Sequence, residues 1–289
     1  MKVFVTNPHG YCMGVIQAIK IALQVKKANP DRRVAVLGML VHNEEVIKML
    51  EGYQIETLIP EVDSYTKAIE AIDPNTIVIF TAHGHDEKLD EIAVRRGIEI
   101  HDATCKMVKE NSQQIKEALQ AGHQVIYIGK SHHPETVAAL SLGADVYLYD
   151  HEMNFDFCLI EDKSPLVINQ TTLSMLEIKH VHDHILAAIP NAHIADEICD
   201  ATRQRQTAVY NIPVDVELIY IVGSPKSSNT AKLTSIASST HPNAKVRQIK
   251  TVKDILDRDL EGISYVAVAS GASTPMEITD EVIAYLKQY

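Results

Sequence analysis

The sequence predicts an α/β protein built from three similar units, each with a small and mostly parallel sheet. The first observation is a repeat: Cys12 and Cys105 lie 93 residues apart, and Cys105 and Cys199 lie 94 apart. The second is a shared pattern after each cysteine, in which an apolar stripe at helical spacing, weaker after Cys199, precedes a short β-rich run. Strands that alternate with helical segments are typical of parallel α/β sheets.

The elements recur in one order. After each helix comes a first strand, predicted at 34–37, 124–128 and 218–222. Each first strand runs into a polar loop, in which His42, His133 and Ser227 lie 30, 28 and 28 residues after the cysteine of their unit. A second strand comes later in each unit and also ends in polar residues, predicted at 76–80, 166–168 and 265–269. Ligands bind at such strand ends in parallel sheets.

The period divides the 289 residues into units at 1–101, 102–197 and 198–289. We expect these units to pack around a pseudo-threefold axis, with one cysteine and two polar loops of each unit facing the centre. The strand at 3–6 fits either the first or the third unit on sequence alone.

Bulk properties exclude several classes of protein. The net charge of −11 provides no basic field for nucleic acid. No apolar run is long enough to cross a bilayer, so we expect no membrane segment and a cytoplasmic protein. Four cysteines in a chain of this length do not make a disulfide framework. Cys158 falls off the period, and its apolar surroundings predict a core residue.

The three cysteines expected at the centre are Cys12, Cys105 and Cys199. Nucleophilic catalysis needs only one cysteine, so three of them indicate a site for a soft metal instead. Structural zinc is disfavoured because no CxxC pair is present. A 4Fe–4S cluster held by three cysteines leaves one iron open to an oxygen ligand. Helix N-termini beside the cysteines favour the thiolate form.

The polar loops supply hydrogen-bond donors that suit a phosphate or diphosphate. They are His42, His83, His133, Ser227, Ser228, Asn229 and Ser273. Ser-Ser-Asn is also a good helix cap, and most of the 14 histidines are ordinary polar groups. Glu135 is either a favourable charge in a first helical turn or a proton donor. Thr171 or Thr172 is placed to position a substrate hydroxyl.

Short motifs along the whole chain carry a resemblance to a known family. They are Gly10–Val15 (GYCMGV), Val41–Asn43, Ala82–Gly84, Asp102–Cys105, His133–Glu135, Gln170–Ser174, Ile198–Cys199 with Ala201–Thr202 and Arg205–Gln206, Gly223–Ser224 with Ser227–Asn229, and Gly271–Pro275. Each motif is weak alone, but their order and separations are specific. The chain resembles the 4-hydroxy-3-methylbut-2-enyl diphosphate reductase family of the non-mevalonate isoprenoid pathway.

The resemblance implies a trefoil of three α/β domains around a 4Fe–4S cluster bound by Cys12, Cys105 and Cys199. The seven loop residues named above match the residues of the diphosphate pocket. Glu135 matches the acid that delivers the proton, and Thr171 matches the residue beside the substrate hydroxyl. His133 is expected to take part in catalysis together with these two. In the family, two electrons and two protons remove the hydroxyl as water, which produces isopentenyl and dimethylallyl diphosphate. A ferredoxin- or flavodoxin-type partner supplies the electrons.

Several positions depart from the family pattern. Lys106 replaces a usual proline, Asp200 a usual tyrosine, and His132 a common glycine; Gln204 and Ile16–Gln17 also differ. None removes an expected ligand. Lys106 and Asp200 come directly after cluster cysteines, where charge affects a reduction potential.

Two other interpretations stay open on sequence. One is a cluster-dependent dehydratase or quinolinate synthase-like enzyme without net redox, which the donor-rich diphosphate pocket disfavours. The other is an inactive cluster-bearing paralogue or sensor, which would need neither Glu135 nor Thr171.

Overall fold

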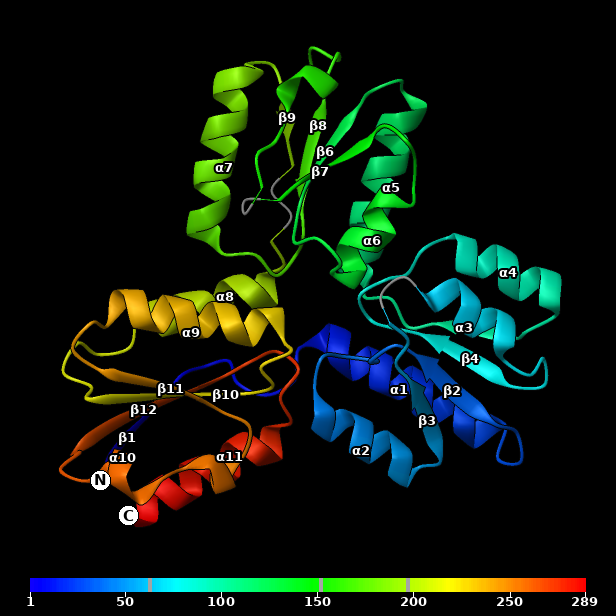
Figure 1. The fold of residues 1–289 in the computed structure, drawn as a ribbon. Helices are drawn as coiled ribbons and strands as arrows, with labels where there is room; N and C mark the ends of the chain where they lie inside the picture. Colours follow the sequence, from blue (N-terminus) through cyan, green and yellow to red (C-terminus); the bar gives the residue numbers. More distant parts are fainter. Residues whose placement is uncertain (62–63, 151–152, 196–197) are drawn as a thin grey trace. The chain divides into compact units, whose positions relative to one another are not determined.

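The computed structural model describes residues 1–61, 64–150, 153–195 and 198–289. Within these ranges the strands form three separate four-stranded sheets (Figure 1). Every strand pairing in them is parallel. The predicted class, three similar α/β units with parallel sheets, is confirmed.

The first sheet has the strand order β3-β2-β4-β5. Its strands are β2 (Val34–Leu37), β3 (Ile55–Leu58), β4 (Ile77–Phe80) and β5 (Ile100–Asp102), and the helices of this region are α1 (Met13–Ala28), α2 (Glu44–Gly52), α3 (Tyr65–Ala71) and α4 (Lys88–Arg96). Helices α3 and α4 cover one face, where Ile69 and Ile92 pack against Val78 and Phe80. Both central strands are fully buried, which explains their continuous apolar sequences.

The second sheet has the order β7-β6-β8-β9. Its strands are β6 (Val125–Ile128), β7 (Val146–Tyr149), β8 (Leu166–Asn169) and β9 (His193–Ile194), and its helices are α5 (Lys106–Gln120), α6 (Pro134–Leu140), η2 (Phe157–Leu159) and α7 (Met175–Ala188). Helix α7 covers one face and α5 and α6 the other (Figure 1).

The third sheet has the order β1-β12-β10-β11. Its strands are β1 (Lys2–Val5), β10 (Leu218–Val222), β11 (Lys245–Ile249) and β12 (Tyr265–Ser270), and its helices are α8 (Asp200–Tyr210), α9 (Ser228–Thr240), η3 (Val252–Asp254), α10 (Asp257–Leu260) and α11 (Met276–Gln288). Helices α8 and α9 cover one face, and α10 and α11 the other (Figure 1).

One topology recurs in all three sheets. Taken along the chain, the strands of the first and second sheets are ordered second, first, third, fourth. The third sheet has the same order if β1 takes the place of its fourth strand. Along the chain, the fourth strands β5 and β9 are the last strands before Cys105 and Cys199, and β1 is the last strand before Cys12. The N-terminal strand, which the sequence left between two units, therefore completes the third sheet.

The described chain divides into two compact bodies. The terminal body comprises Met1–Ile16, His42–Val46 and Cys199–Tyr289, and the central body comprises Gln17–Val41 and Ile47–Ile198. The three-unit boundaries remain a prediction, and residue 197, the end of the predicted second unit, lies outside the described residues.

The expectation that Cys158 is a core residue is wrong, because its side chain is exposed. It lies in the short 3₁₀ helix η2, where the Asp156 carboxylate accepts a hydrogen bond from the Cys158 amide at 2.9 Å. This turn packs Phe155 and Phe157 against Tyr149. Cys158 therefore belongs to a turn whose two phenylalanines face the core, while its own side chain points outward.

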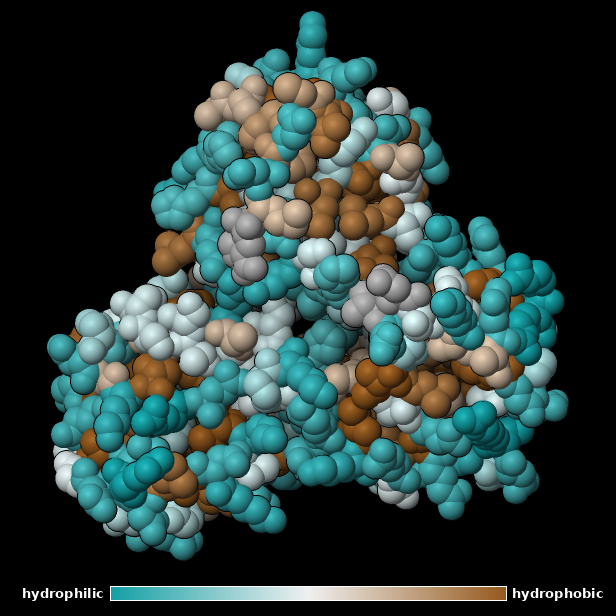
Figure 2. Space-filling view, viewed as in Figure 1, coloured by the Kyte–Doolittle hydropathy of each residue, from teal (hydrophilic) through white to brown (hydrophobic). Residues whose placement is uncertain are grey.

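Hydrophilic residues predominate on the face of the molecule drawn in Figure 2. Among the residues that the structure describes, no helix is both long enough and apolar enough to span a bilayer.

Candidate active site

The three periodic cysteines each stand immediately before a helix. Cys12 precedes α1, Cys105 is the N-cap of α5, and Cys199 is the N-cap of α8. All three are half-buried and none forms a disulfide with a described residue. A helix N-terminus carries partial positive charge, which stabilises a thiolate and makes it a better metal ligand. The predicted placement at helix starts is therefore confirmed.

Cys12 and Cys199 lie in the same body, and both act on one buried arginine. Arg205 is 4% exposed, and its Nη2 donates a hydrogen bond to the Gly10 carbonyl at 2.7 Å. Burial lowers the pKa of Arg205, and electrostatic interaction with Cys12 and Cys199 acts against that shift. The terminal body thus places two of the three predicted ligands around one cation.

Cys199 also has close polar neighbours of its own. Its Sγ atom lies 3.1 Å from the Thr202 hydroxyl oxygen and accepts a hydrogen bond from the Thr202 amide at 3.4 Å. The Asn229 side-chain amide donates to that hydroxyl at 3.4 Å, and its carbonyl oxygen accepts from the Ala272 amide at 3.2 Å. Asn229 therefore connects the Cys199 helix with the loop after β12.

The predicted diphosphate residues of the terminal body gather at the N-terminus of α9 and the carboxyl ends of β10 and β12. Ser227 is the N-cap of α9 and accepts from the Thr230 amide at 3.3 Å, and Ser228 is its first residue. The Ser273 hydroxyl donates to the His42 carbonyl at 3.3 Å. Helix and strand ends of this kind present amide groups to an anion.

His42 is a neutral imidazole near pH 7. Burial, with a contribution from the positive charge of Lys226, lowers the pKa of His42 to about 4. Lys226 lies 3.8 Å from the Glu44 carboxylate. A neutral histidine donates one ring hydrogen bond, so Lys226 rather than His42 supplies a formal positive charge here.

In the central body, Glu135 and Thr171 form a buried pair at the carboxyl end of the second sheet. One Glu135 carboxyl oxygen accepts from the Thr171 amide at 2.8 Å, and the other from the Thr171 hydroxyl at 3.1 Å. Glu135 is 2% exposed. Burial raises the pKa of Glu135 to about 7, although the hydrogen bonds from Thr171 act to lower it. The carboxyl therefore exchanges a proton near neutral pH.

His83 and His133 lie beside this pair. Their ring centroids are 5.6 Å apart in an edge-on arrangement. His133 is the N-cap of α6, and its Nδ1 accepts from the Glu135 amide at 3.3 Å. That bond assigns the ring proton of His133 to Nε2, which makes Nε2 a donor.

Cys105 lies next to the His83 loop. Its amide donates to the Ala82 carbonyl at 2.9 Å. Gly84 has a φ of +86°, and a Cβ atom there would lie 3.1 Å from the Ala138 Cβ on α6. The central body therefore brings together Cys105, His83, His133, Glu135 and Thr171.

Comparison with known proteins identifies the family. The model of the LytB protein family matches residues 3–287. The chain belongs to the LytB family. A curated relative from Exiguobacterium sp. (strain AT1b), named 4-hydroxy-3-methylbut-2-enyl diphosphate reductase, is 38% identical over 100% of the chain and 91% of the relative. A reductase of the same name from Malacoplasma penetrans is 34% identical over 100% of the chain and 98% of the relative.

Solved structures agree with the family assignment. One solved structure is that of the E-1-hydroxy-2-methyl-but-2-enyl-4-diphosphate reductase from Plasmodium falciparum. Its match covers 99% of this chain and 88% of the Plasmodium chain, with a TM-score of 0.88 and 26% sequence identity. A second reductase structure, described as the terminal enzyme of the non-mevalonate pathway, matches all of both chains with a TM-score of 0.70 at 24% identity, and supports the fold.

LytB proteins are iron–sulfur reductases. Among the described residues, no group of three or more His, Cys, Asp or Glu side chains is placed to hold a metal ion. Cys12 and Cys199 belong to the terminal body and Cys105 to the central body, so their convergence stays a prediction. The donor chemistry fits a cluster, because each thiol is half-buried at a helix start.

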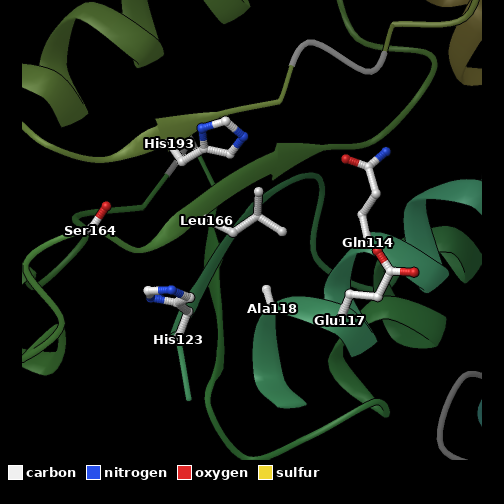
Figure 3. Close-up of a pocket in the computed structure, with 7 residues that line it drawn as sticks. All are labelled: Gln114, Glu117, Ala118, His123, Ser164, Leu166 and His193. Carbon is white, nitrogen blue, oxygen red and sulfur yellow. The ribbon is translucent and has the colours of Figure 1, made fainter. Parts of the chain in front are cut away.

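A cavity of about 350 Å³ in the central body is lined by residues other than the predicted site residues (Figure 3). It is lined by Gln114, Glu117, Ala118, His123, Ser164, Leu166 and His193. These residues surround the amino ends of β6, β8 and β9, whereas Glu135 and Thr171 are at the carboxyl ends. The cavity is therefore separate from the candidate active site.

Sequence reasoning assigned no role to Arg205 or Lys226. Arg205 was noted as part of a motif, but the apolar stripe of its helix is weak and does not show which side chains are buried. Lys226 stands in the polar loop before α9. A basic residue in a loop of phosphate-binding character was a signal that could have identified it.

Proposed function

We propose that the chain reduces 4-hydroxy-3-methylbut-2-enyl diphosphate to isopentenyl and dimethylallyl diphosphate. The carbon–oxygen bond of the hydroxyl breaks, two electrons enter the allylic fragment, one proton leaves with the hydroxyl as water, and a second proton is added to carbon. The observation that carries the proposal is the buried Glu135 carboxyl, whose pKa of about 7 lets it keep a proton near neutral pH beside Thr171. The family to which the chain belongs supports it throughout its length.

We assign substrate binding to two sets of donors. His42, Ser227, Ser228, Asn229 and Ser273 in the terminal body, and His83 and His133 in the central body, would hold the diphosphate. The neutral His42 ring and the amides at the start of α9 donate hydrogen bonds, while Lys226 adds positive charge. Thr171 would orient the substrate hydroxyl, and its own bond to Glu135 brings that hydroxyl near the proton source.

Proton delivery falls to Glu135. In its protonated form the carboxyl is a hydrogen-bond donor, and a pKa near the working pH suits general acid catalysis. His133 supports this arrangement because its Nδ1 accepts from the Glu135 amide and fixes the start of α6. The role of His133 is thus to bind the diphosphate through Nε2 and to hold the turn that carries the acid.

For the redox part of the reaction we propose a 4Fe–4S cluster bound by Cys12, Cys105 and Cys199. With these three thiolates as ligands, such a cluster would supply the two electrons and a Lewis-acidic iron for the substrate hydroxyl. The thiolates are favoured by their helix N-termini. We further propose that a ferredoxin- or flavodoxin-type protein delivers the electrons.

The test is an anaerobic assay of the reconstituted protein with reduced methyl viologen and 4-hydroxy-3-methylbut-2-enyl diphosphate. We expect both isoprenoid diphosphates, with one pair of electrons consumed for each molecule formed. Loss of water without electron consumption would support the dehydratase alternative. Absence of any product from cluster-loaded protein would contradict the proposal and favour an inactive paralogue.

A further inference from the structure

Arg205 joins the two segments that carry Cys12 and Cys199. It lies on α8, one turn after Ala201, and its Nη1 donates to the Ala201 carbonyl at 3.0 Å. Its Nη2 donates to the Gly10 carbonyl at 2.7 Å, across 195 positions of sequence. A single side chain therefore connects the Cys12 loop with the helix that begins after Cys199.

The third guanidinium nitrogen, Nε, differs from these two. It is buried and has no hydrogen-bond partner among the described residues. A buried donor without a partner is costly and rare in native proteins, so it calls for an explanation such as an absent ligand. The two carbonyls that the guanidinium holds, those of Gly10 and Ala201, are each two residues from a predicted cluster ligand, Cys12 or Cys199. The acceptor that would satisfy Nε is therefore expected to carry negative charge and to be bound at these cysteines.

We propose that Arg205 is a positioning residue that donates its Nε–H group to a sulfur atom of the bound cluster and raises the cluster's reduction potential. The inference rests on the proposed cluster at Cys12 and Cys199. Hydrogen bonds to sulfur and local net charge are two determinants of an iron–sulfur potential. A fixed positive charge stabilises the reduced cluster, because that state is one electron more negative.

A lysine could not replace Arg205 in this arrangement. The guanidinium presents several donors in a rigid plane, so two can hold backbone carbonyls while a third points elsewhere. An ammonium group keeps the charge but lacks that geometry. The charge and the Nε–H group can therefore be separated by substitution.

The experiment is a redox titration of reconstituted protein, monitored by electron paramagnetic resonance, for wild type, Arg205→Lys and Arg205→Met. We expect the midpoint potential to shift negative in both variants, and further in Arg205→Met, which loses the charge as well. Arg203→Met is the matched control, because Arg203 is on the same helix and carries the same charge. Its potential should stay close to that of wild type.

A second measurement separates this role from simple structural support. Hydrogen–deuterium exchange of residues 10–14 in the same variants should increase when the bond to Gly10 is lost. Increased exchange with unchanged midpoint potentials in both Arg205 variants would overturn the proposal. If Arg205→Met does not fold, the midpoint potential of Arg205→Lys alone tests the proposal.

Failure of the proposed function gives a different result. In that case wild-type protein takes up no iron and sulfide, and the inference on Arg205 fails with it. A cluster-loaded wild type with the same potential as the Arg205 variants would overturn the inference alone. An equal shift in Arg203→Met would also overturn it, because the effect would then be one of general charge.

Discussion

Glu135 has two properties at the residue scale that seldom occur together. It is buried at 2% exposure, and it contacts a flexible hydroxyl, that of Thr171, rather than a fixed cation. Burial without a countercharge favours the protonated carboxyl. The sequence identified both residues, but it could not show that they touch, because 36 positions separate them.

The first prediction concerns Glu135→Gln. We expect turnover to fall by roughly 10²–10⁴-fold, the usual contribution of a general acid, while the cluster and substrate binding are retained because the amide keeps the size of the carboxyl. Single-turnover kinetics and iron content measure the two effects. Glu117→Gln is the matched control, since Glu117 is an exposed carboxylate of the same body at the distant cavity. Normal turnover in Glu135→Gln would show that the proton has another source.

The second prediction concerns pH. The pKa of Glu135 is raised from 4.5 to about 7 in the folded protein. Between these two pH values the folded state keeps a proton on Glu135 that the unfolded state has released. The resulting contribution to folding stability is complete below pH 4.5 and is lost as the pH rises through about 7. The acid form is also the active form, so kcat should decline above about pH 7. A kcat that does not fall as the pH is raised above about 7 would refute the assignment of Glu135 as the acid.

At the scale of elements, the sequence predicted the two buried strands of each sheet, the strand at 3–6 and the helix after each cysteine, but not the edge strands β3, β5, β7, β9 and β11. The buried strands of the sheets were recognised from continuous apolar runs, because helices cover both faces. The expectation for Cys158 was wrong, because its apolar neighbours suggested a core residue. A 3₁₀ turn forms there instead, because the Asp156 carboxylate accepts a hydrogen bond from the Cys158 amide. Such local bonds between a side chain and the backbone leave no periodic pattern in the sequence.

His132 shows a departure from the family pattern that has a structural cost. Its φ is +62°, a left-handed conformation that glycine adopts freely and other residues rarely do. The family resemblance described above implies glycine at this position. His132 directly precedes His133 and lies three residues before Glu135. The backbone strain is therefore in the loop that positions the proposed acid.

The third prediction follows from that strain. We expect His132→Val to lower the free energy of unfolding by about 1–3 kcal/mol, because a β-branched residue is disfavoured at this φ. His132→Gly, the matched control, should retain wild-type stability within about 1 kcal/mol. Urea unfolding of both variants measures the difference. Equal stability of the two variants would indicate that the loop adopts another conformation.

At the scale of the whole molecule, the internal repeat predicted three sheets but not the sheet that the N-terminus joins. Strand β1 pairs with β12 through contacts such as Phe4 with Ala267. A sequence pattern describes a strand but not its partner at the other end of the chain. The same is true of Arg205 and Gly10, whose contact spans 195 positions.

The shared topology gives the cysteine period a physical cause. In each repeat the fourth strand is the last strand before the cysteine that follows in the sequence, and β1 supplies the fourth strand of the third sheet. The spacing of 93 and 94 residues is therefore the length of one structural repeat. This cyclic relation supports the prediction that the three cysteines are equivalent positions of one site.

The departures Lys106 and Asp200 are on exposed helix starts. The Lys106 ammonium lies 3.3 Å from the Glu110 carboxylate one turn along α5, and its side chain is 86% exposed. Water and this partner weaken its field. We therefore expect Lys106 to affect the cluster less than the buried Arg205 does.

The central claim is that Cys12, Cys105 and Cys199, which come from two bodies of the chain, bind one cluster. Iron and sulfide content after anaerobic reconstitution of Cys12→Ala, Cys105→Ala, Cys199→Ala and Cys158→Ala tests it most directly. We predict that Cys158→Ala binds as much iron as wild type and that each of the other three loses the cluster. A Cys105→Ala protein that keeps a full cluster, or a Cys158→Ala protein without iron, would contradict the account.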